Sequence, residues 1–116
     1  MLTDSPLSFE VAEGKAAGTR IFRLAGPLTL ANLFELQDAL RKEPQPRVTV
    51  LDLGGVPYMD SAGMGAIINY YVHCQKKGAT LVVAGVSSRV MELFKMTKVD
   101  TVIPLRAAFD EDEFGA

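Results

Sequence analysis

The sequence predicts an α/β domain in which a mixed, mostly parallel sheet of four to five strands is packed with about four helices. Its 116 residues match the length of one typical domain, so we expect residues 1–116 to form a single one. A hydrophobic fraction of 48% with 22% charged residues is that of a globular chain and excludes wholesale disorder. After an initial hairpin pattern, strand and helix patterns alternate, which is typical of a parallel sheet.

The first third of the chain predicts a hairpin and then a helix. Residues 7–11 alternate apolar and polar side chains, and residues 21–24 form a second apolar run after a short connection. Gly26 and Pro27 end this second strand. Thr29 is the expected N-cap of a helix that would carry Leu30, Leu33, Phe34, Gln37 and Leu40 on one stripe.

The middle third predicts a central strand and a long helix. Residues 47–53 are apolar enough for an interior strand. From residue 61 to 77 the apolar period becomes helical, and Gly78 is the expected C-terminal cap. The predicted inward stripe is Met64, Ile67, Ile68, Tyr71 and Val72. Other side chains of this helix are expected to point outward, among them Asn69, Tyr70, His73 and Lys76.

The last third predicts a strand at residues 80–84 and a short helix capped by Ser87 or Ser88. A final short strand is expected at residues 102–103, followed by a terminal helix that holds Leu105, Ala108 and Phe109. The acidic run at residues 110–113 is expected to be a solvated surface.

Charge and cysteine content exclude several classes of function. The 12 Lys and Arg residues against 14 Asp and Glu give a net charge of −2, and no basic run exceeds two residues, so we expect no nucleic-acid partner. One cysteine cannot form an internal disulfide, which suits the reducing cytoplasm. The N-terminus does not resemble a signal peptide, and no apolar stretch approaches the roughly 20 residues that cross a bilayer. We therefore expect a cytoplasmic protein without membrane insertion.

No enzyme motif is complete. His73 and Cys74 are adjacent, which fits no zinc-site spacing, and two residues are too few ligands. Ser61 and the glycine two residues later form half of a nucleophile elbow, but Met59 stands where that motif needs glycine. The Gly63–Gly65 segment lacks the third glycine of a dinucleotide fingerprint and the lysine of a P-loop. We expect no catalysis, metal or cofactor, and a hydrolase that uses Ser61 is the least favoured alternative.

The segment from Tyr58 to Gly65 joins a loop to the start of the long helix and has two interpretations. As structure, Asp60 or Ser61 would cap the helix, and the small residues would let it pack close to a strand. As function, a serine at a helix N-terminus lies where free backbone N–H groups and the helix dipole stabilise an added phosphate.

This segment resembles a known signature. Residues 53–65, with Asp60, Ser61 and Gly63 as the most specific part, are similar to the signature of STAS domains, in particular of bacterial anti-sigma factor antagonists. Three further segments resemble the family's strand-to-helix corner, its fourth strand and its short helix with the exit from it, at residues 24–28, 78–86 and 90–99. The resemblance covers about residues 7–110 in family order.

The resemblance implies partner switching. An unphosphorylated antagonist of this family binds an anti-sigma factor, which then releases its sigma factor. In many systems the anti-sigma factor is a serine kinase of the ATPase fold that inactivates the antagonist, and a metal-dependent serine phosphatase restores it. The phosphoacceptor position carries over to Ser61. The expected partner contacts lie in the motif, in the corner at residues 27–32 and along the long helix: Asp60, Ser61, Ala62, Gly63, Thr29, Asn32, Asn69, Tyr70 and His73.

The charge of a phosphate is consistent with such a switch. Phosphorylation of Ser61 would add about −1.5 to −2 charges beside Asp60. The helix N-terminus could hold this charge without unfolding, whereas a docked and partly desolvated surface would need a cation opposite it. We therefore expect phosphorylation to weaken binding and leave the fold intact.

Two departures from the family pattern keep a second function open. Ala62 replaces a second hydroxyl residue that often follows the serine, and Thr29 replaces an aspartate that is common in the corner. The alternative is a STAS subunit that is never phosphorylated and regulates a membrane transporter, such as a lipid-exporting ABC transporter.

Overall fold

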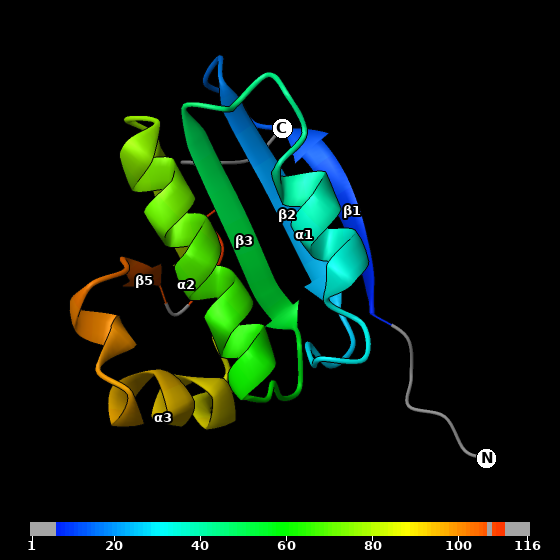
Figure 1. Ribbon diagram of the computed structural model, residues 1–116, viewed down its shortest axis with the longest axis vertical. Helices are drawn as coiled ribbons and strands as arrows, with labels where there is room; N and C mark the ends of the chain where they lie inside the picture. The colour runs from blue at the N-terminus through cyan, green and yellow to red at the C-terminus, as the bar shows by residue number, and fades with distance from the viewer. Residues whose placement is uncertain (1–6, 107, 111–116) are drawn as a thin grey trace.

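A computed structural model describes residues 7–106 and 108–110 and contains one five-stranded sheet with helices packed against it (Figure 1). In chain order the elements are β1 (Ser8–Glu13), β2 (Thr19–Ala25), α1 (Phe34–Leu40), β3 (Val48–Gly55), α2 (Ser61–Lys76), β4 (Thr80–Ala84), α3 (Ser88–Met96), the 3₁₀ helix η1 (Val99–Thr101) and β5 (Leu105–Arg106). The strands lie side by side in chain order, with β1 antiparallel to β2 and the other pairs parallel. The predicted mixed sheet is confirmed, with three α-helices rather than about four among the described residues.

The two faces of the sheet are covered differently. α1 and α2 lie on one face (Figure 1), and the main core between them and the sheet includes Phe22, Leu51, Ile67 and Phe94. On the opposite face a second buried cluster, against which Phe109 packs, consists of Ile21, Val50, Val82 and Ala84. The central strands are therefore buried on both faces, which is why their sequences are continuous apolar runs.

The first helix begins later than the sequence predicts. Thr29 is not its N-cap, because the Thr29 N–H donates to Asn32 Oδ1 (2.9 Å) while Asn32 Nδ2 donates to the carbonyl of Pro27 (2.7 Å). These bonds close a compact turn, and helical geometry begins only at Phe34. As a result Leu30 and Phe34, which were expected to face the core, are 59% and 60% exposed.

The long helix α2 has nearly the predicted extent but a rotated face. It ends before Gly78, which adopts a φ of 70° as a C-terminal cap requires. Tyr70, predicted to point outward, is 2% exposed, whereas Val72, predicted to point inward, is 43% exposed. Three consecutive apolar residues at positions 70–72 are compatible with either phase of the helix, and the packing against the sheet selects the one that buries Tyr70.

The C-terminal part differs most from the sequence prediction. Ser87 caps α3 as predicted, its Oγ accepting the Val90 N–H at 3.2 Å. Residues 102–103, predicted to form a strand, form a turn instead. Ile103 is buried all the same, and it reaches the core from this loop. Residues 108–110 are not helical, and the rest of the acidic run, residues 111–113, lies outside the described residues.

Candidate functional site

The start of α2 is organised by the carboxylate of Asp60. Its Oδ1 accepts the Gly63 N–H at 2.8 Å, which makes Asp60 the N-cap of the helix. Its Oδ2 accepts the Leu30 N–H at 3.1 Å, from a loop thirty residues earlier in the chain. The N–H donors, above all that of Gly63, hold the pKa of the Asp60 carboxyl below its usual value. One side chain therefore caps the helix and ties the loop before α1 to it.

The main chain reinforces this tie. Leu28 and Met59 form a parallel bridge in which the Leu28 N–H donates to Tyr58 O (3.2 Å) and the Asp60 N–H donates to Leu28 O (3.3 Å). A side chain at Gly63 would collide with the carbonyl of Leu28, so the helix start can approach the corner only because residue 63 is glycine. The corner and the motif thus form one rigid surface.

Ser61 is the accessible hydroxyl of this surface. It is the first residue of α2 and is exposed, whereas Ala62 is half-buried and Gly63 is buried. The hydroxyl lies at the positive end of the helix dipole, where Asp60 Oδ1 already accepts the Gly63 N–H. The dipole favours a phosphate at this position, and the carboxylate of Asp60 opposes it.

Exposed apolar side chains lie in the corner at residues 27–32, which Asp60 holds against α2, and directly after it. Leu30 is 59% exposed and follows directly from the segment that Asp60 holds, and Phe34 is 60% exposed at the start of α1. Thr29 and Asn32, expected to contact a partner, are half-buried, and the side chain of Asn32 is engaged within the turn. The apolar pair was missed in the sequence because both residues fit the stripe of a helix that starts at Thr29.

Three predicted contact residues, Asn69, Tyr70 and His73, lie in the second half of α2. Tyr70 is about 13 Å along the helix from Ser61 at 1.5 Å per residue, so the structure does not bring the two together. The Tyr70 hydroxyl is buried 2.8 Å from Thr49 Oγ1, and burial raises the pKa of this phenol. His73 is half-buried, with Nε2 2.9 Å from Gln45 Oε1, and Asn69 is exposed. Tyr70 is therefore part of the core and not of an outward surface.

A shallow groove borders the motif on the side of α3. It has a volume of about 240 Å³ and lies between Tyr58 and Met59 on one side and α3 on the other. The Arg89 guanidinium carbon lies 5.4 Å from the centre of the Tyr58 ring, and Met96 at the end of α3 is 80% exposed. The groove therefore has a mixed lining, with Met59, Leu93 and Met96 beside the charged Arg89 and Glu92.

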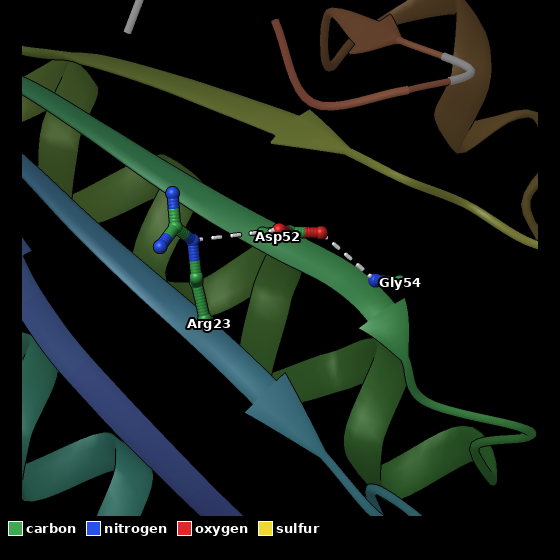
Figure 2. Close-up of polar contacts among 3 residues, drawn as sticks. All are labelled: Arg23, Asp52 and Gly54. Carbon is green, nitrogen blue, oxygen red and sulfur yellow. Dashed lines mark hydrogen bonds and ion pairs between the residues drawn. The ribbon is translucent and has the colours of Figure 1, made fainter. Parts of the chain in front are cut away.

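The end of β3 is held by a polar contact on the sheet face opposite α1 and α2. Figure 2 shows Asp52 Oδ1 accepting the Gly54 N–H at 2.9 Å while Asp52 Oδ2 lies 3.8 Å from Arg23 Nε on β2. The Arg23 guanidinium also lies over the Phe109 ring, 4.8 Å from its centre. These contacts fix the strand from which the loop to Asp60 departs.

Residues 7–106 and 108–110 contain neither a cluster of metal-binding side chains nor a helix that could span a membrane. No group of three or more His, Cys, Asp or Glu side chains in these ranges could hold a metal ion. No helix in them is both long and apolar enough to cross a membrane.

Comparisons with known proteins identify the family. A model of the STAS domain matches residues 10–111. This chain belongs to the STAS domain family. The anti-sigma-B factor antagonist of Listeria monocytogenes is 28% identical over 102 residues, which cover 86% of this chain and 89% of that protein.

Solved structures of two kinds share the fold of this STAS domain. An anti-sigma factor antagonist from Mycobacterium paratuberculosis matches with a TM-score of 0.80 at 18% identity, over 94% of each chain. A sulfate transporter family protein from Wolinella succinogenes matches with a TM-score of 0.70 at 25% identity, over 83% of this chain and 82% of that one.

Proposed function

We propose that this STAS domain is an anti-sigma factor antagonist whose unphosphorylated form binds an anti-sigma factor and so releases a sigma factor. Phosphorylation of Ser61 switches this binding off. The observation that carries the proposal is the exposed Ser61 at the start of α2, on a surface that Asp60 joins to the apolar corner at Leu30. The similarity to an anti-sigma-B factor antagonist along most of both chains supports it.

The apolar corner and the serine have different parts in this function. Leu30 and Phe34 supply apolar surface. Its burial in a complex contributes a favourable free energy of about 25 cal/mol per Å². A phosphate on Ser61 adds two formal negative charges at most, beside the carboxylate of Asp60. Both charges would have to be desolvated on docking, so the phosphorylated surface binds poorly unless the partner presents cations.

The proposed activity is binding alone. The chain supplies the acceptor serine, and the chemistry belongs to two partners: a serine kinase of the ATPase fold, which is the anti-sigma factor itself, and a metal-dependent serine phosphatase. Such an exchange takes place in the cytoplasm, where sigma factors act.

The test compares two serines in matched positions. Ser61 and Ser88 are each the first residue of a helix, each follows a polar N-cap, and both are exposed. Wild type, Ser61→Asp and Ser88→Asp are used as baits in native lysate, and captured proteins are identified by mass spectrometry. We expect a serine-kinase anti-sigma factor with the wild type and with Ser88→Asp, and its loss with Ser61→Asp. Equal capture by all three would overturn the role of Ser61.

A second function is supported by the match to a transporter family protein from Wolinella succinogenes. In this alternative the domain is a regulatory subunit of a membrane transporter, for example a lipid-exporting ABC transporter, and Ser61 only begins the helix. The same pull-down separates the two functions. Recovery of an ATP-binding transporter subunit by all three baits, with no anti-sigma factor, would favour the alternative.

A further inference from the structure

The sheet ends at β1, whose outer edge is unpaired among the described residues (Figure 1). Val11, near the middle of this strand, is 51% exposed although it is apolar. A free strand edge presents main-chain N–H and C=O groups that can pair with a further strand. The residues of β1 indicate which kind of strand could pair with this edge.

The outward groups follow from the pairing with β2. Gly14, directly after β1, donates its N–H to the carbonyl of Thr19 at 2.9 Å. Bonded residues alternate along an antiparallel strand, so the main-chain groups of the even-numbered residues of β1 point toward β2. The N–H and C=O groups of Phe9, Val11 and Glu13 therefore point toward the free edge.

These outward residues are complementary to a second copy of the same strand. If Val11 lies opposite Val11 of the other copy in an antiparallel pair, Phe9 lies opposite Glu13, and Glu10 lies opposite Ala12. Every outward residue then exchanges main-chain hydrogen bonds, and no two glutamates are opposed. A pair centred on Glu10 would instead oppose two glutamates, which is unfavourable.

A groove beside the strand favours the same arrangement. It has a volume of about 650 Å³ and an apolar floor that includes Phe9 and Val11. Its charged residues are Arg20, Glu35, Asp38, Lys42 and Glu43.

The charges are divided between the two ends of this groove. Glu35, at the start of α1, lies near Leu7 before β1, whereas Arg20 lies near Glu13 at the end of β1. Glu35 makes the first end acidic, and Asp38 lies one turn further along α1. The second end carries both cations, Arg20 and Lys42, together with Glu13 and Glu43. An antiparallel pair places the acidic end of one copy against the cation-bearing end of the other.

We propose that two copies of this chain pair through β1, antiparallel and centred on Val11. The two-fold axis is perpendicular to the sheet, so the five strands of each copy form one continuous sheet with α1 and α2 of both copies on the same face. The half-buried Phe9 and the exposed Val11 of both copies then form one apolar strip between the two α1 helices. The pairing does not rest on the proposed function, because it uses the edge strand β1, and β2 separates this strand from β3, whose end leads to Ser61.

The first test is the mass of the full chain in sedimentation velocity over a wide range of concentration. We expect it to rise from one chain toward two. Proline at position 11 removes an outward N–H and keeps every bond to β2, so Val11→Pro is expected to weaken self-association about tenfold or more. Val11→Lys should weaken it as well, whereas Val72→Lys, at a matched exposed valine on α2, should not. Circular dichroism of each variant confirms that the fold is retained.

The second test reports the register. Residues opposite each other across the proposed pair are close enough for a disulfide, so Val11→Cys should crosslink under a mild oxidant. Glu10→Cys faces Ala12 of the other copy and should crosslink much more slowly, and the native Cys74 is buried. A chain that stays monomeric at every concentration, a dimer unaffected by Val11→Pro, or faster crosslinking of Glu10→Cys would each overturn the proposal.

Discussion

The starts of α2 and α3 are alike locally and differ in what they hold together. Each begins with a polar cap, Asp60 or Ser87, whose oxygen accepts an N–H three residues later, at 2.8 and 3.2 Å. Each cap is followed by an exposed serine, Ser61 or Ser88. Only Asp60 has a second oxygen, and it binds the N–H of Leu30, thirty residues away in the chain.

A helix cap acts beyond its own helix when its spare acceptor fixes a second segment. Ser87 has one oxygen, and its bond to Val90 serves α3 alone. The carboxylate of Asp60 serves α2 and also fixes the loop that exposes Leu30. Both helix starts could hold a phosphate, but that of α2 is tied to an exposed apolar corner.

The largest expected effect tests the close approach at the start of α2. Gly63→Ala places a methyl group against the carbonyl of Leu28 and should lower the free energy of unfolding by about 3 kcal/mol. Gly65→Ala is the control, because a side chain there meets open space and should stabilise the helix by up to about 1 kcal/mol. Denaturant unfolding measures both, and similar stabilities of the two variants would contradict the packing argument.

The next effect compares the two caps directly. Asp60→Ala removes two hydrogen bonds and should cost about 2 kcal/mol, whereas Ser87→Ala removes one and should cost about 1 kcal/mol. Amide exchange at Leu30 adds a local measurement, and it should accelerate in Asp60→Ala alone. Unchanged exchange at Leu30 would show that the corner is held without Asp60.

A smaller effect concerns partner binding by the corner. Leu30→Ser should weaken binding to the anti-sigma factor about tenfold, because it removes exposed apolar surface beside Ser61. Its unfolding free energy should change by no more than about 0.5 kcal/mol, as for other exposed positions. Val102→Ser, at a 56% exposed valine in the turn after α3, is the control for binding. Isothermal titration with the captured anti-sigma factor measures the change, and a wild-type affinity for Leu30→Ser would exclude the corner from the interface.

The smallest effect is a difference in pH dependence between the two caps. Folding lowers the pKa of the Asp60 carboxyl. The carboxylate therefore stabilises the fold fully at pH values above its pKa in the unfolded chain, and this stabilisation is lost as the pH falls through its pKa in the folded protein. The stability difference between wild type and Asp60→Asn should therefore shrink between neutral pH and about pH 3. Ser87 does not ionise in this range, and Ser87→Ala should keep a constant offset. Thermal unfolding across the pH range distinguishes the two behaviours.

Local sequence patterns predicted the strands of the hairpin, the central strands, the extent of α2 and the cap at Ser87. Each of these depends on periodicity or on a cap within a few residues. The Asp60–Ser61 motif was found in the same way, because its residues are consecutive.

What the sequence could not predict depends on contacts between distant segments. Thr29 has a good capping side chain, but the turn closed by Asn32 and the bond from Asp60 to Leu30 delay the helix to Phe34. The burial of Tyr70 depends on Thr49 in β3, and no pattern within α2 contains that partner. The exposure of Leu30 and Phe34 results from these long-range contacts. Local sequence patterns therefore could not predict it.

Phe109 has a consequence for folding during synthesis. The cluster it packs against, which includes Ile21, Val50 and Val82, is assembled from β2, β3 and β4, all of which leave the ribosome before it. When β4 has left the ribosome but residue 109 has not, this face of the sheet lacks the Phe109 side chain that packs against it. Exposed aliphatic surface in a partly synthesised chain promotes aggregation and attracts chaperones. This face therefore acquires Phe109 only after β2, β3 and β4 have left the ribosome.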